Sequence, residues 1–149
     1  MKKVFDRNLI GFIKEKFADD RDKHLYCFWN GGNERIKYII NFIKEDGTIL
    51  TGDDEAVRIN EDRNNPGHFI CSFSSKNKIY GPVTTKDVSN HPKKLTFITM
   101  AGFEGCDLFD MKGESYLIID NSYGSCIYDW QTIVQCFGRL RNNLYSVNI

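Results

Sequence analysis

The start of the chain repeats apolar positions with helical spacing and then changes to an unbroken apolar run. Residues 1–18 make an amphipathic pattern whose apolar members are Val4, Phe5, Leu9, Phe12, Ile13 and Phe17. The run LYCFW at 25–29 shows no alternation and is followed by Asn30, Gly31 and Gly32. Such a run is typical of a strand covered on both faces, as in a parallel sheet. We therefore predict an amphipathic helix at 1–18 and a buried strand at 25–29.

A second helix and a second strand are predicted to follow. Asn33 is suited to cap a helix, and the apolar stripe that comes after it has i, i+3, i+4, i+7 spacing: Ile36, Ile39, Ile40 and Ile43. Asp46 and Gly47 end this helix, and residues 48–51 begin a short strand. Strand, glycine turn, helix and strand make up a βαβ unit.

Patterning is weaker from 52 to 92, and we predict an irregular insert there. It contains a short helix near 54–60, a polar turn, and an apolar patch at 68–73, before loop residues continue to Pro92.

Regular patterning returns in the last third of the chain. Residues 95–99 and 116–119 have the character of buried strands, and 144–149 alternates like a closing strand. Between them, 129–140 is predicted as a helix with Ile133, Val134 and Phe137 on one face. Strands that alternate with helices predict a single α/β domain over 1–149 with a mostly parallel sheet.

Charge, cysteine content and hydropathy constrain the cellular compartment of the protein more than they constrain its function. Lys plus Arg and Asp plus Glu are 20 each, so any nucleic-acid contact has to be local. No apolar run is long enough to cross a bilayer, and charged residues interrupt the apolar N-terminus as they would not in a signal peptide. The cysteines follow no zinc or disulfide spacing, which favours a reducing cytoplasmic setting: Cys27, Cys71, Cys106, Cys126 and Cys136.

The loop TMAGFEGCD at 99–107 follows a predicted strand, where ligands of α/β proteins usually bind. The hydroxyl of Thr99 and nearby backbone N–H groups can hold a nucleic-acid phosphate. Gly105 lets the loop fold back closely, and Asp107 can accept a hydrogen bond from a ribose or pair with an arginine. Taken alone, the segment is also explained as a turn of small residues with Asp107 as a cap.

The segment QCFGRLR at 135–141 carries two arginines at the end of a predicted helix. A guanidinium is planar, always charged and able to bind bidentately, so Arg139 and Arg141 could stabilise charge on a transferring phosphoryl group. The alternative is a basic helix C-terminus, in which both arginines only complement the helix dipole.

Together, the two segments resemble motifs V and VI of the C-terminal RecA-like lobe of superfamily-2 (DEAD/DEAH-type) helicases. They occur in the family's order with one predicted strand between them, and LYCFWNGGNERIKYIINFI is similar to motif IV and its helix. A narrower likeness is to phage and mobile-element replication helicases. The resemblance implies a RecA-like (P-loop NTPase-like) three-layer domain.

The resemblance also assigns roles to individual residues. It implies nucleic-acid contacts from Thr99 and Asn30, ATP contacts from Gln135, Gly138, Asp107 and Gly105, and catalytic arginines at Arg139 and Arg141. The arginine spacing departs from the family pattern, because Leu140 alone separates the pair and the expected second position falls on Asn142. Arg139 is the safer assignment, and which arginine reaches a γ-phosphate stays open.

The chain lacks the other half of a helicase ATP site. No GxxxxGK[ST] phosphate loop occurs, and the acidic GDDEA at 52–56 is better explained as a helix start than as a Mg²⁺-binding box. The resemblance therefore implies ATP and Mg²⁺ only in combination with a first RecA-like lobe, with no metal site in this chain. Its expected partners are that lobe and DNA or RNA, single-stranded, while self-association stays possible.

Two alternatives belong to other functional classes. One is a nucleic-acid-binding module without motor function, whose binding would depend on salt but not on nucleotide. The other is a protein-interaction or oligomerisation domain that uses the N-terminal amphipathic helix as its docking surface.

Overall fold

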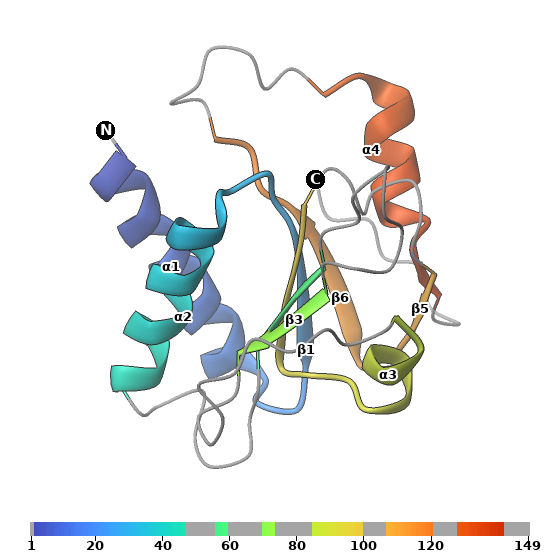
Figure 1. Cartoon of the computed structure of the whole chain (residues 1–149), viewed down its shortest axis with the longest axis horizontal. Coiled ribbons are helices and arrows are strands. Elements are labelled where there is room, and N and C mark those ends of the chain that lie inside the picture. Colours follow the sequence, from blue (N-terminus) through green and yellow to red (C-terminus); the bar gives the residue numbers. More distant parts are fainter. Residues whose placement is uncertain are drawn as a thin grey trace.

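The computed structural model describes residues 2–46, 56–59, 70–73, 85–99, 107–120 and 128–141. Its centre is a five-stranded sheet in the order β3-β2-β4-β1-β6 (Figure 1). The strands are β1 (His24–Phe28), β2 (Ala56–Ile59), β3 (Ile70–Phe73), β4 (Leu95–Ile98) and β6 (Gly113–Leu117). Strand β1 pairs in parallel with β4 and β6, and β2 pairs in parallel with β4. Strand β3, at the edge of this sheet, is antiparallel to its neighbour, β2. The predicted α/β class with a mostly parallel sheet is confirmed.

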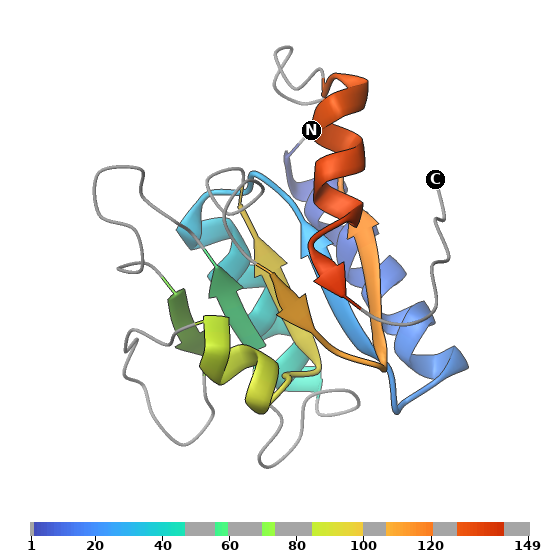
Figure 2. The same ribbon diagram turned by 90° about the vertical axis from the view of Figure 1, so that its right-hand side faces the viewer.

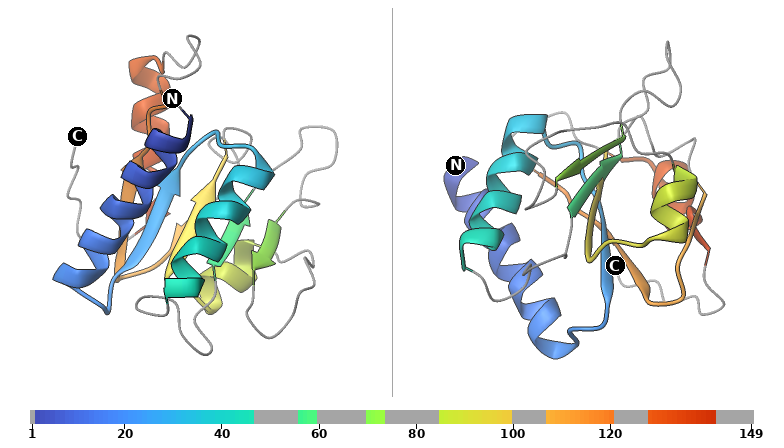
Figure 3. Two further views of the ribbon diagram at one scale, coloured as in Figure 1. Left: turned by 90° about the vertical axis from the view of Figure 1, so that its left-hand side faces the viewer. Right: turned by 60° about the horizontal axis from the view of Figure 1, so that its bottom comes forward.

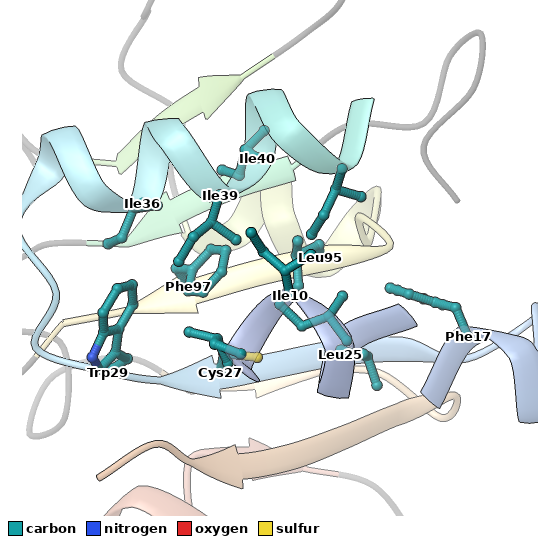
Figure 4. Close-up of a cluster of buried hydrophobic side chains, with 13 residues drawn as sticks. Ile10, Phe17, Leu25, Cys27, Trp29, Ile36, Ile39, Ile40, Leu95 and Phe97 are labelled. Atoms are coloured by element: carbon teal, nitrogen blue, oxygen red, sulfur yellow. The ribbon is translucent and has the colours of Figure 1, made fainter. Parts of the chain in front are cut away.

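Two helices, α1 (Lys2–Asp19) and α2 (Asn33–Asp46), cover one face of the sheet (Figure 3, left). All four isoleucines of the predicted α2 stripe are fully buried. They pack with alternate residues of β1 and β4 in one apolar cluster, and Figure 4 shows Ile36 and Ile39 close to Phe97 and Trp29. The 3.6-residue period of the helix and the two-residue period of the strands thus meet in this core.

The opposite face is covered by α3 (Thr85–Asn90), α4 (Trp130–Phe137) and a small two-stranded sheet (Figure 2). The small sheet pairs β5 (Leu108–Phe109) in parallel with β7 (Leu140–Arg141). Tyr26 and Phe28 of β1 point to this side and pack with Val88, Leu108 and Cys136. Strand β1 is therefore covered on both faces, which explains why its sequence is apolar without alternation.

The structure corrects several predicted boundaries. Helix α1 forms as predicted, but Val4 is 61% exposed and does not belong to its buried face. The helix predicted at 129–140 ends at Phe137, after which Leu140 pairs with Leu108 in a strand. The strand predicted at 116–119 spans Gly113–Leu117 instead.

The helix predicted near 54–60 is wrong, because Ala56–Ile59 is strand β2. Its β-branched Val57 and Ile59 suit a strand, and pairing with β4 on one side and β3 on the other supplies its backbone hydrogen bonds. With β2, β3 and α3, the 52–92 segment is not wholly irregular. The strands predicted at 48–51 and 144–149 lie outside the described residues. In the part of the chain that the structure describes, no helix is long and apolar enough to cross a membrane.

Candidate functional site

The carboxyl ends of β1, β4 and β6 meet at one edge of the sheet. The N–H of Trp29 donates to the carbonyl of Ile98, and the N–H of Ile118 donates to the carbonyl of Phe28, each at 2.8 Å. Asn30, which is exposed, therefore follows β1, while Thr99, which is 3% exposed, follows the neighbouring strand β4. The two residues predicted to contact nucleic acid thus lie at the same edge.

The chain leaves this edge toward opposite faces of the sheet. After β1 it enters α2 on one face, whereas β6 is followed by α4 on the other face (Figure 1). In open α/β sheets, the crevice where successive connections diverge is where ligands bind. Asn30, which follows β1, therefore lies beside such a crevice, whereas Thr99 follows β4 on the other side of β1.

Asp107 and Arg139 are brought together by the small sheet on the α4 side. The N–H of Leu108 donates to the carbonyl of Arg139 at 2.9 Å, and Leu108 pairs with Leu140. Beside this pairing, Nη1 of Arg139 lies 3.9 Å from Oδ1 of Asp107. Their side chains are 22% and 49% exposed, so solvent weakens the attraction. The predicted ATP-side residues of the two motifs are neighbours in space.

Helix α4 positions the remaining residues of the second motif. Asp129 caps its N-terminus by accepting a 2.7 Å hydrogen bond from the N–H of Thr132, and that bond lowers the pKa of Asp129. Gln135 lies in the last helical turn and is partly exposed. Gly138 ends the helix with φ −74°, and its N–H bonds to the carbonyl of Val134.

The backbone at Gly138 does not require a glycine, because its φ is one that any residue adopts. A methyl group at that position would lie 3.4 Å from the carbonyl oxygen of Val134, a tight but not forbidden contact. The glycine is thus not explained by the helix end alone. Arg141 has its backbone in β7, opposite Phe109, and its side chain lies outside the described residues. Gly105 and the rest of 100–106 also lie outside them.

Arg35 forms an ion-pair network at the carboxyl edge that the sequence analysis missed. Its Nη2 donates to Oδ1 of Asp6 and its Nη1 to Oδ2 of Asp120, each at 2.6 Å. Its guanidinium lies 4.9 Å from the ring centre of Trp29 and 5.4 Å from that of Phe5, within cation–π range. Burial opposes the charge of Arg35, but the hydrogen bonds to both carboxylates outweigh that effect and raise its pKa.

This network joins three elements at the edge where Asn30 and Thr99 lie. Asp6 comes from α1, Arg35 from the first turn of α2, and Asp120 from the segment that follows β6. Because both carboxylates already hold the guanidinium, we assign Arg35 a positioning role. The only sequence signal was Asp6, a charge that interrupts the apolar face of α1.

A second polar cluster lies at the opposite, amino-terminal edge of the sheet. Asp110 accepts hydrogen bonds at 2.7 Å from the ring nitrogen Nδ1 of His24 and from the hydroxyl of Tyr26. The N–H of Lys112 also donates to it, at 2.9 Å. These bonds hold the turn between β5 and β6 against the start of β1. They therefore fix the segment that carries Asp107.

Two of the cysteines fit the interpretation of small apolar core residues. Cys27 and Cys136 are free and buried, and burial raises the pKa of each thiol to about 12. Such thiols are poor nucleophiles and poor metal ligands at neutral pH. Among the described residues, no group of three or more His, Cys, Asp or Glu side chains is placed to hold a metal ion.

Comparison of the chain with models of known protein families, with curated proteins and with solved structures finds no match. The candidate site therefore rests on the two motifs and on the geometry described above.

Proposed function

We propose that this chain is the second RecA-like lobe of a superfamily-2-type helicase, in which it completes an ATP site supplied mainly by a first lobe. The observation that carries the proposal is the 3.9 Å approach of Arg139 to Asp107. The two residues come from segments that resemble separate helicase motifs, and a chance resemblance would not need to place them together. The mostly parallel sheet, covered on both faces, is compatible with a RecA-like lobe.

In this proposal Arg139 moves between two anions. Asp107 holds the guanidinium near the small sheet through a weak, partly exposed ion pair. When a first lobe brings ATP, Arg139 turns to the phosphates, because a phosphate oxygen pair binds the guanidinium fork bidentately and carries more charge. Gln135 and Gly138 lie beside the same helix end. ATP supplies the transferable phosphoryl group, and the chain itself contributes positive charge where negative charge develops.

The nucleic-acid side of the proposal is the carboxyl edge of the sheet. Asn30 is exposed there and is suited to donate a hydrogen bond to a phosphate or sugar oxygen. Thr99 is almost fully buried, so its role is to anchor the start of the 100–106 segment rather than to offer a broad contact. The Arg35 network keeps the strand ends at this edge in register.

The test is nucleic-acid-stimulated ATP hydrolysis by the tagged full chain, purified from its own cells with the proteins bound to it. Arg139→Ala should reduce this ATPase activity by about 10³-fold while the same proteins still co-purify. Arg7→Ala, at an exposed position on α1, is the matched control and should leave the activity unchanged. Stimulated ATP hydrolysis that is insensitive to Arg139→Ala would refute the proposal.

The nucleic-acid-binding module is the second candidate, and the lack of a phosphate loop in the sequence favours it. It predicts oligonucleotide binding that weakens with salt, by about 0.7 in log–log slope per single-strand phosphate contact, and that ATP does not alter. Fluorescence anisotropy with and without ATP separates the two candidates. The apolar face of α1 packs in the core, so a protein-docking function would have to use another surface.

A further inference from the structure

An apolar groove runs along the outer edge of β6, at the margin of the sheet. Helix α1 borders it on one side and α4 on the other, and the left view of Figure 3 shows β6 between these helices. The cavity is about 380 Å³, and its walls include Phe5, Phe12, Tyr116, Ile118, Ile133 and Phe137. Among the described residues, no strand pairs with this edge of β6. A groove so apolar is costly to leave in contact with water.

The backbone of β6 makes the groove suited to an extended segment. The N–H of Ile118 donates to Phe28 of β1. In a parallel strand, alternate residues point their N–H and C=O groups to the same side, so Glu114 and Tyr116 also face β1. Ser115 and Leu117 then direct theirs to the outer edge. Unpaired edge groups of this kind are a template for another strand.

The chain itself arrives at the start of this edge. A methyl group added to Gly113, the first residue of β6, would lie 2.8 Å from Cδ2 of Leu140. Leu140 is thus packed against the amino end of β6. From there, residues 142–149 can span roughly 26 Å when extended, whereas a five-residue strand spans roughly 17 Å. Strand β6, helix α4 and a following parallel strand would form a standard right-handed βαβ unit.

The residues that follow have the composition of a strand. Residues 144–149 read LYSVNI, with Tyr145, Val147 and Ile149 on one side and Leu144, Ser146 and Asn148 on the other. The segment carries no charge, so its burial between two apolar helices leaves no ion unpaired.

We propose that residues 144–149, which lie outside the described residues, bind in parallel along the outer edge of β6 and fill the groove between α1 and α4. The docked segment would hold residues 139–141 between α4 on one side and the added strand on the other. Docking would therefore fix Arg139 beside Asp107. The proposal does not depend on the helicase function, since it follows from the groove, the strand edge and the position of Leu140.

The test is amide hydrogen exchange and NMR on the unmodified full chain at low concentration. The outward amides of Ser115 and Leu117 should be protected to the same degree as those of Glu114 and Tyr116. Cross-strand contacts between β6 and residues 144–149 should also be observed. Outward amides that exchange at unprotected rates, without such contacts, would overturn the proposal.

Variants identify the occupant of the groove. The double change Val147→Asp and Ile149→Asp should lower protection at Ser115 and Leu117 by about tenfold or more and leave β1 protected. Val134→Asp, at an exposed site on α4, is a control that adds one carboxylate outside the groove. It should leave the protection of Ser115, Leu117 and β1 unchanged. Protection that survives the double change, or that rises with protein concentration, would assign the groove to another ligand or to a second copy and would contradict the proposal.

Discussion

Arg35 and Asp120, 85 positions apart in the sequence, are joined by a 2.6 Å hydrogen bond from Nη1 to Oδ2. The same guanidinium also holds Asp6, and the side chains of both acids are 10% exposed or less. The guanidinium thus links the first turn of α2, helix α1 and the segment after β6 in one cluster. The stability of this cluster depends on all three charges being present, because both acids are largely removed from water.

Replacement of Arg35 by Met should destabilise the fold strongly. Two carboxylates would be left without a cation in a poorly solvated site, and the loss of one partner from a buried pair costs about 3–5 kcal/mol. Urea unfolding gives the free energy of unfolding. The further change of Asp6 and Asp120 to Asn should recover part of the loss, and Arg7→Met is the exposed control. A loss no larger than that of the control would mean that the network contributes little.

Acid should unfold the protein partly through Asp110. Burial alone would raise its pKa, but hydrogen bonds from His24, Tyr26 and the N–H of Lys112 outweigh burial and lower it. Because the folded pKa lies below the unfolded value of about 3.9, this stabilisation is fully present above that value. It is lost as the pH falls through the folded pKa.

The check on this pH dependence is unfolding by urea from pH 7 to pH 3 for the wild type and for Asp110→Asn. The variant should be less stable at pH 7 by about 1–3 kcal/mol and should show a shallower decline toward low pH. Equal slopes in the two proteins would show that Asp110 is not a source of the acid sensitivity.

Gly31 and Gly32 are adjacent, yet replacement by alanine should destabilise the fold at Gly31 and have little effect at Gly32. A methyl group on Gly31 would lie 2.5 Å from Cε3 and Cζ3 of Trp29. A methyl group on Gly32 would have no neighbouring atom within 4 Å. Trp29 is buried, under Arg35 and against Phe97, so its ring has little room to move. Gly31→Ala should therefore cost about 1–3 kcal/mol, while Gly32→Ala should change stability by less than about 0.5 kcal/mol.

Thermal and urea unfolding of the two glycine variants provide the measurement, and Gly32→Ala is the matched control for Gly31→Ala. Comparable losses at both positions would show that the backbone, rather than the indole of Trp29, sets the requirement for glycine.

Elements with strong local patterns were predicted correctly, and those that depend on distant partners were not. Helix α2 and strand β1 are apparent from the sequence, because a full stripe of isoleucines or an unbroken apolar run has few other solutions. The sequence predicts a helix where strand β2 forms, because four residues are too short a window for periodicity to decide between helix and strand. Its strand conformation comes from pairing with β4 and β3.

The features of the candidate site also divide into those apparent from the sequence and those that depend on distant partners. The segments at 99–107 and 135–141 stand out in the sequence by their resemblance to helicase motifs, and the apolar run before Thr99 predicts its position at a strand end. That helix α4 stops at Phe137 and is followed by a strand could not be seen, because this strand depends on the pairing of Leu140 with the distant Leu108.

The sequence by itself determined the α/β class of the fold, because hydrophobic period is a local property, and it marked two segments as candidates for chemistry by their residue types. Only the tertiary structure decided that Arg139 lies beside Asp107 and that Arg35 lies between Asp6 and Asp120. These partners are joined by strand pairing and helix packing between distant segments, which no local spacing along the chain encodes.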